Sequence, residues 1–131
     1  GIRIVRSGGI YGPGRWLGGR FRAGDFGRIG SGNKMVSRIH VYDLARLILA
    51  LSNLSGDQGP YVMNAVDEKP SSNKETFTYL EHLLGIKIPG GWREARPQGR
   101  KIVSNYVKTL LGIPCARLTF IRLIGLDVKR L

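Results

Sequence analysis

Glycine is concentrated in one stretch of the chain, and this stretch limits regular structure more than any other feature. Ten of the 19 glycines lie within residues 7–35, and the densest run is GGIYGPG at residues 8–14. Glycine permits a positive φ and a close approach of the backbone to another group, while Pro13 fixes a turn. We therefore predict a Gly/Arg-rich loop over residues 7–35, preceded by a short strand at residues 2–5.

Strand and helix patterns alternate through residues 36–131. An extended segment at 37–41 precedes a helix capped by Asp43, and a strand is predicted at 60–66. Ser72 and Glu75 then form a capping box for a helix that Gly85 stops. Further helices are predicted at 104–111 and 118–125. The apolar stripes of the two internal helices are Leu44, Leu47, Ile48, Leu51 and Leu54 in the first and Phe77, Leu80 and Leu84 in the second. These patterns predict an α/β fold with too few strands for a sheet covered on both faces.

The formal net charge of +12 is spread evenly along the chain. Residues 1–66 hold nine Lys and Arg against three Asp and Glu, and residues 67–131 hold twelve against six. Such a charge favours adsorption to polyanions at low salt but does not indicate a basic tail. The densest cluster has two interpretations, a phosphate- or nucleic-acid-facing loop or a solvated surface, and the lack of a recognised nucleic-acid-binding module favours the second. The cluster consists of Arg15, Arg20, Arg22 and Arg28.

Several classes of protein are excluded by what the sequence lacks. The single cysteine, Cys115, excludes an internal disulfide and a multi-cysteine zinc site. No apolar run approaches the roughly 18–20 residues that a membrane span needs. The two histidines, His40 and His82, lack metal-ligand spacing, so we assign no metal site and expect His40 to be a structural hydrogen-bonding residue. Asp67 and Glu68 are adjacent at a strand end, point in opposite directions, and are not predicted to form an acid/base pair.

Four segments carry a resemblance to a known family. They are RSGGIYGPGR at residues 6–15, RIHVYDLA at 38–45, YVMNAVDEKP at 61–70, and RKIVSN at 100–105 followed by LLG at 110–112. In this order and spacing they resemble the C-terminal half of the extended and atypical short-chain dehydrogenase/reductases, the NAD(P)-dependent epimerase/dehydratase superfamily. The resemblance implies an α/β fold that is the C-terminal, substrate-side portion of a Rossmann-type NAD(P)-binding fold and is incomplete on its own. Residues 1–131 would then be a single domain or a fragment, with residues 36–131 as its α/β substrate-side region.

The resemblance also implies which residues touch ligands. Ser7, Gly8 and Ile10 would contact the nicotinamide end of NAD or NADP. A second set would bind a small-molecule substrate, with an arginine paired to an anion and a tryptophan stacked on a ring; this set is Gly9, Arg15, Trp16 and Arg38. Gly9 departs from the family pattern, because sugar-nucleotide members commonly place an asparagine there.

Two features of the family are missing from the sequence. No G-x-G-x-x-G turn for the cofactor pyrophosphate occurs. None of the five tyrosines has a lysine four residues later, so the Tyr-x-x-x-Lys pair that exchanges protons in these enzymes is also missing. We therefore assign no catalytic residue, and we expect a missing N-terminal Rossmann half, or a partner chain, to supply both features.

Three hypotheses for function follow. In the first, the chain is part of an NAD(P)-dependent epimerase, dehydratase or reductase and contributes a wall of the substrate cleft and the nicotinamide-side loop, without being catalytic alone. In the second, it is a non-catalytic, dehydrogenase-like structural subunit of a larger assembly, an organellar one included. The third and weakest, a free-standing nucleic-acid binder, rests on the charge alone. The expected setting is soluble and intracellular, with the compartment left open.

Overall fold

The structure is a computed structural model that describes residues 2–26, 30–92, 96, 99–104 and 110. Nine elements follow one another along the described chain: β1 (Ile4–Ser7), β2 (Gly9–Tyr11), α1 (Leu17–Arg22), β3 (Met35–Val36), β4 (Arg38–His40), α2 (Val41–Ser52), β5 (Val62–Ala65), β6 (Ser71–Ser72) and α3 (Asn73–Leu84). The predicted α/β class is thereby confirmed. The helices predicted at 104–111 and 118–125 lie outside the described residues apart from Ser104 and Leu110.

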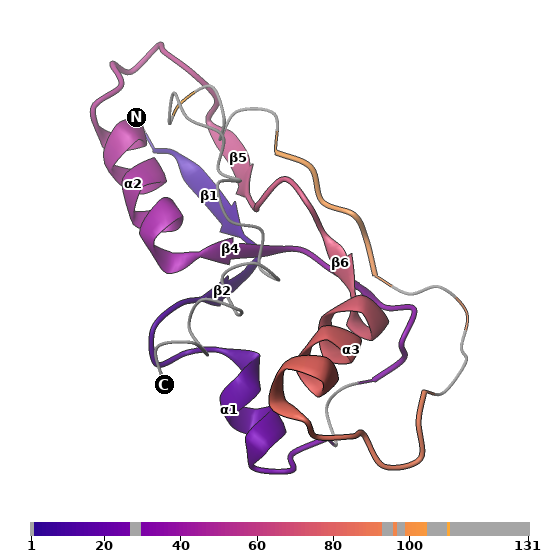
Figure 1. Cartoon of the computed structure of the whole chain (residues 1–131). Helices are drawn as coiled ribbons and strands as arrows, with labels where there is room; N and C mark the ends of the chain where they lie inside the picture. The colour runs from indigo at the N-terminus through magenta and orange to yellow at the C-terminus, as the bar shows by residue number, and fades with distance from the viewer. Residues whose placement is uncertain (1, 27–29, 93–95, 97–98, 105–109, 111–131) are drawn as a thin grey trace.

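The strands pair two by two, and the two longer pairs are parallel (Figure 1). β1 pairs with β5 from Ile4 opposite Val62, and β2 pairs with β4 from Gly9 opposite Arg38. The third pair, β3 with β6, is antiparallel. Parallel pairs are typical of α/β folds in which helices cover the faces of a sheet.

Gly8 is the point at which the first strand passes from one partner to the other. Its N–H donates to the carbonyl of Ala65, beside β5, and the N–H of Gly9 donates to the carbonyl of Ser37, beside β4, each at 3.0 Å. A Cβ on Gly8 would lie 2.6 Å from the Ser37 oxygen and 2.9 Å from a methyl group of Val66. This close approach of three backbone segments explains why the position holds glycine.

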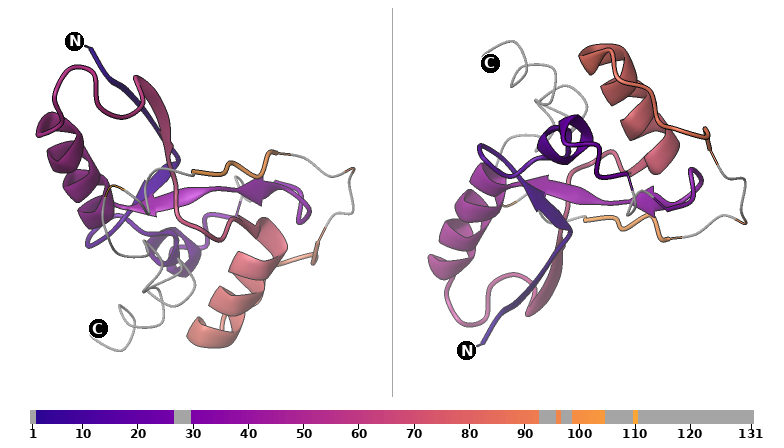
Figure 2. Two further views of the ribbon diagram at one scale, coloured as in Figure 1. Left: turned by 90° about the horizontal axis from the view of Figure 1, so that it is seen from above. Right: turned by 90° about the horizontal axis from the view of Figure 1, so that it is seen from below.

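Two apolar clusters hold the elements together. The helix of one cluster, α2, lies apart from the helices of the other, α1 and α3 (Figures 1 and 2). The first lies between α2 and the strands and contains Ile39, Leu47, Leu51, Met63 and Ala65, all buried. The second joins α1 to α3 and contains Tyr11, Phe21, Phe77 and Leu80. The predicted stripe of α3 is thus confirmed at Phe77 and Leu80, while Leu84 is partly buried.

The ends of α3 form as the sequence predicts. Ser72 caps the helix by accepting from the N–H of Glu75 at 3.1 Å, and the Glu75 carboxylate accepts from the N–H of Ser72 at 2.7 Å. These bonds lower the pKa of Glu75, because they stabilise the charged carboxylate. Gly85 ends the helix in the left-handed conformation, with φ of 67°.

The start of α2 differs from the prediction. The helix begins at Val41, and its N-cap is His40 rather than Asp43. The Nδ1 atom of His40 accepts a hydrogen bond from the N–H of Tyr42 at 3.2 Å. A histidine ring nitrogen therefore takes the acceptor role that an aspartate usually fills, and Asp43 lies in the first turn, where its negative charge favours the helix N-terminus. The structural hydrogen-bonding role predicted for His40 is confirmed.

The glycine-rich stretch is not entirely irregular. α1 forms within it although two of its six residues are glycines. Phe21 is 1% exposed and packs against Phe77 with ring centroids 5.8 Å apart and against Phe26 at 5.2 Å. Burial of this ring outweighs the low helix propensity of the glycines, which explains why the prediction of a loop throughout residues 7–35 was wrong.

No described helix combines the length and the apolar character that crossing a bilayer requires.

Candidate functional site

A cleft of about 580 Å³ lies along β2, between β4 and α1. β2 lines it with Gly9, Ile10 and Tyr11, β3 adds Val36, and β4 adds Arg38. The turn after β2 and the first residues of α1 complete the wall with Gly14, Arg15, Trp16, Leu17, Gly19 and Arg20. Its volume is that of a small-molecule site.

Five of the seven predicted ligand-contacting residues line this one cleft. They are Gly9, Ile10, Arg15, Trp16 and Arg38, which come from two separate segments of the sequence. Ser7 and Gly8 do not line it: Ser7 is exposed at the end of β1, and Gly8 occupies the strand crossing described above. The structure thus brings most of the predicted set together, while the ligands assigned to these residues stay predictions.

A tight turn aims Arg15 and Trp16 at the cleft. Gly12 and Arg15 exchange two backbone hydrogen bonds of 3.0 Å across Pro13 and Gly14, and Gly14 has a φ of 73°. A proline followed by a glycine of positive φ suits the two central positions of such a turn. The predicted turn at Pro13 is confirmed, and it sends the chain directly into α1.

The ring of Trp16 is seated by its neighbours in α1. A Cβ on Gly18 would lie only 1.8 Å from the Trp16 ring, so the ring rests directly on the backbone of Gly18. The Arg22 guanidinium lies 6.0 Å from the ring centroid, within the range of a cation–π contact. Because two partners fix the ring, Trp16 presents a defined apolar surface to the cleft.

Arg38 is the buried cation of the cleft. It is 8% exposed, and its Nη1 donates to the hydroxyl of Ser71 at 3.3 Å. That hydroxyl also bonds to the hydroxyl of Thr76 at 3.0 Å, which connects the guanidinium to the start of α3. Burial lowers the pKa of Arg38 to about 10, against the raising effect of Asp67, so the side chain stays charged at neutral pH.

Sequence reasoning missed the importance of Asp67, which is 6% exposed beside Arg38. The backbone N–H of Asp67 donates to the carbonyl of Arg38 at 2.7 Å, but neither carboxylate oxygen makes a hydrogen bond to a described residue. Burial raises the pKa of Asp67 to about 7, and this effect exceeds the lowering of that pKa by the positive charge of Arg38 and by the backbone amide of Lys69. Only the position of Asp67 directly after a buried strand could have indicated this burial.

The cleft has the chemistry of an anion-binding site. Three arginines, Arg15, Arg20 and Arg38, line it, and among the described residues no Asp or Glu does. Guanidinium groups suit phosphate and carboxylate, while Trp16 offers a surface for a planar or apolar group. The described residues also contain no group of three side chains able to hold a metal ion. The arrangement is suited to binding and orienting a charged molecule.

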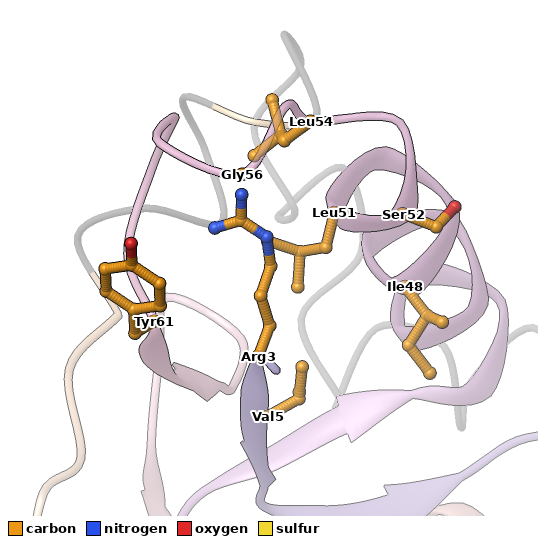
Figure 3. Close-up of a pocket in the computed structure, with 8 residues that line it drawn as sticks. All are labelled: Arg3, Val5, Ile48, Leu51, Ser52, Leu54, Gly56 and Tyr61. Carbon is orange, nitrogen blue, oxygen red and sulfur yellow. The ribbon is translucent and has the colours of Figure 1, made fainter. Parts of the chain in front are cut away.

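A second cavity, of about 420 Å³, lies between α2 and the start of β1 (Figure 3). Arg3, the residue before β1, extends into it between Tyr61 and Leu51. Its guanidinium donates to the carbonyls of Ser55 at 2.6 Å and Pro60 at 3.3 Å and lies 5.9 Å from the Tyr61 ring. The side chain of Arg3 is thus used to hold the loop after α2 against β1, which gives this cavity a structural explanation.

Comparison with known proteins agrees with the fold. No protein-family model and no curated protein matches the chain. Solved structures do match it. UDP-glucuronic acid 4-epimerase from Bacillus cereus is 16% identical with a TM-score of 0.70, over 98% of this chain and 44% of that one. dTDP-glucose 4,6-dehydratase from Bacillus anthracis, in complex with NAD, is 18% identical with a TM-score of 0.69, over 96% and 43%.

A protein from Methylobacillus flagellatus described as an NAD-dependent epimerase/dehydratase is 25% identical with a TM-score of 0.68, over 98% of this chain and 48% of that one. The chain therefore has the fold of a part of the Rossmann-type NAD-dependent epimerases and dehydratases. It spans less than half the length of each of these structures. The resemblance noted in the sequence is confirmed at the level of the fold, as is the prediction of a partial Rossmann-type fold.

Proposed function

We propose that this segment forms the substrate-side wall and the nicotinamide-side loop of an NAD(P)-dependent epimerase, dehydratase or reductase. The observation that carries the proposal is the convergence of Gly9, Ile10, Arg15, Trp16 and Arg38 on one cleft. Four of these residues come from two of the segments that resemble the family, and Trp16 directly follows the first of those segments. The structural neighbours include complexes with NAD and, in some, with UDP-sugars.

The residues present fit one end of a dinucleotide. Gly9 is exposed and Ile10 half-buried beside the cleft, so the backbone of these two residues is accessible there, and the arginines suit an anionic substrate. Ser7, Gly8 and Ile10 would contact the nicotinamide end, and bound NAD(P) would supply hydride transfer. Arg15 and Arg38 would orient the substrate anion, and Trp16 would cover its uncharged part. Proton transfer would belong to residues of the completing half.

An uncovered apolar face supports the need for that half. Ile4 and Val62 are register partners in β1 and β5 and therefore share one face of the pair. Both are about half exposed, at 50% and 44%, and Ile2 beside them is 85% exposed. Parallel strands in α/β proteins are covered on both faces. We propose that the dinucleotide-binding half of the same fold covers this face, on the same or another polypeptide.

The test uses the intact protein that contains this segment. Affinity for NAD and NADP is measured by calorimetry, and affinity for a UDP-sugar is measured with the dinucleotide bound. Arg15→Ala and Arg38→Ala are expected to weaken UDP-sugar binding about tenfold or more and to leave dinucleotide binding nearly unchanged. Arg46→Ala is the matched control, because Arg46 lies on α2 and pairs with Asp43 at 3.6 Å. An intact protein that binds neither dinucleotide refutes the proposal.

Two sequence features favour a second candidate, a non-catalytic structural subunit. They are the net charge of +12 and the glycine at position 9, where sugar-nucleotide members of the family commonly place an asparagine. Such a subunit would co-purify with a larger assembly in a salt-dependent manner and would hold no dinucleotide. The binding measurement above separates the two candidates.

A further inference from the structure

Among the described residues, the carboxyl group of Asp67 has no hydrogen-bond partner that accounts for its burial. Both oxygens are shielded from solvent, and a buried polar group in this state is rare and costly. The charged groups facing it are Arg38 on β4 and Asp43 on α2. Two further titratable groups interact with these two residues and not with Asp67 directly. Tyr11 on β2 interacts electrostatically with Arg38, and His40 interacts electrostatically with Asp43.

Arg38 connects this carboxyl group to the cleft. The guanidinium donates a hydrogen bond to the Ser71 hydroxyl and interacts electrostatically with Asp67. The same side chain lines the cleft, where no described acidic residue lies. The positive charge of Arg38 therefore acts both on Asp67 inside the protein and on an anion in the cleft.

We propose that Asp67 is a positioning residue that acts through Arg38: ionised, it competes with a ligand anion for the guanidinium, and protonated, it leaves the guanidinium to the ligand. The inference rests on the proposed function, because it assumes that the cleft binds an anionic substrate. It adds that this binding is coupled to a proton on Asp67. Because burial raises the pKa of Asp67 to about 7, the exchange falls near neutral pH.

Linkage fixes the direction of the effect. An anion that is attracted by Arg38 and repelled by ionised Asp67 must raise the pKa of Asp67 when it binds, and protonation of Asp67 must tighten anion binding by the same factor. A displacement of that pKa by about one unit corresponds to about a tenfold change in affinity. Anion binding is therefore strongest below the pKa of Asp67 and weakens as the pH rises through it.

Sulfate is the probe for anion binding, because its charge stays constant over the pH range of the experiment. Its dissociation constant for the purified protein is measured from the amide shifts of Gly9 and Ile10, at constant ionic strength, from about pH 5.5 to about pH 8.5. We expect the dissociation constant to rise about tenfold over this range. In Asp67→Asn it should stay at the low-pH value. A titration of the Asp67 carboxyl carbon in the unmodified protein, with and without sulfate, tests the same coupling without a variant.

Two comparisons keep the outcomes distinct. Glu68→Gln removes the same charge from an exposed neighbour and should retain the pH profile. A dependence of sulfate binding on pH that survives the Asp67→Asn substitution overturns the inference. Sulfate binding that requires Arg38 yet does not vary with pH overturns the inference and leaves the proposed cleft intact. No sulfate binding in the cleft at any pH overturns both.

Discussion

Replacement of Asp67 by asparagine should make the stability of the protein less dependent on pH. Burial raises the pKa of Asp67 from 3.8 to about 7 in the folded state. Between these two values the folded state binds a proton that the unfolded state has lost, so the contribution of this group to stability is greatest below about pH 4 and is lost as the pH rises through about 7. The full difference between the folded and unfolded pKa corresponds to about 4 kcal/mol in the free energy of unfolding. About 3 kcal/mol of this is lost between pH 5 and pH 8.5.

The assay is urea unfolding followed by circular dichroism at several pH values, for the unmodified protein and for Asp67→Asn. Asparagine has its own unsatisfied amide, which costs about 1–3 kcal/mol, but this cost is the same at every pH. We therefore subtract the free energy of unfolding of the unmodified protein from that of Asp67→Asn at each pH. The quantity to compare is how this difference changes with pH. From pH 5 to pH 8.5, the free energy of unfolding of the variant should rise by about 3 kcal/mol relative to that of the unmodified protein.

Glu68→Gln provides the matched control, because Glu68 is exposed and its removal changes the net charge equally. The difference in free energy of unfolding between Glu68→Gln and the unmodified protein should vary little over this pH range. If the difference for Asp67→Asn varies equally little with pH, the Asp67 carboxyl is not held in a desolvated environment, and the reasoning from its burial is refuted.

Three other substitutions have expected outcomes. Gly8→Ala should lower the free energy of unfolding by about 1–3 kcal/mol, because its Cβ would lie 2.6 Å from a backbone oxygen, as urea titration would show. Ser72→Ala should cost about 1 kcal/mol in the same assay through loss of the α3 capping box, and an unchanged midpoint would contradict that role. Gly18→Ala should displace the Trp16 ring, and in a Trp92→Phe background the tryptophan emission should shift to longer wavelength; an unshifted spectrum would show that the ring does not rest on Gly18.

Local patterns predicted the elements whose determinants are adjacent in the sequence. The capping box at Ser72 and the stop at Gly85 define α3 by contacts within a few residues, and both are present. The strand predicted at 60–66 appears as β5 over Val62–Ala65, since alternation of buried and exposed residues is also a local signal. The four segments that resemble the family were sufficient to indicate the fold, because their order along the chain matches the order of the corresponding elements in that fold.

Features that depend on distant contacts could not be predicted. α1 forms because Phe21 packs on Phe77, which lies more than fifty residues later and belongs to another element. Asp67 is buried beside Arg38 of β4, which lies 29 residues earlier in the sequence and accepts a hydrogen bond from its backbone N–H, and no local pattern records this pairing. His40 displaced Asp43 as the N-cap of α2 because the end of β4 fixed where the helix starts. In each case the local sequence favoured no single conformation strongly, and contacts between distant elements determined which one formed.

The two adjacent glycines at the strand crossing have different physical meanings. At Gly8 any side chain would collide with the backbone of Ser37, so the fold itself requires glycine there. At Gly9 a Cβ would lie 3.6 Å from the Arg38 side chain, an ordinary contact, and its φ lies outside the positive region, so the fold would accept a larger residue. Because Gly9 and Arg38 are register partners beside the cleft, a side chain at position 9 would instead occupy space next to the guanidinium. The fold therefore does not require glycine at position 9, and a larger residue there would narrow the cleft beside Arg38.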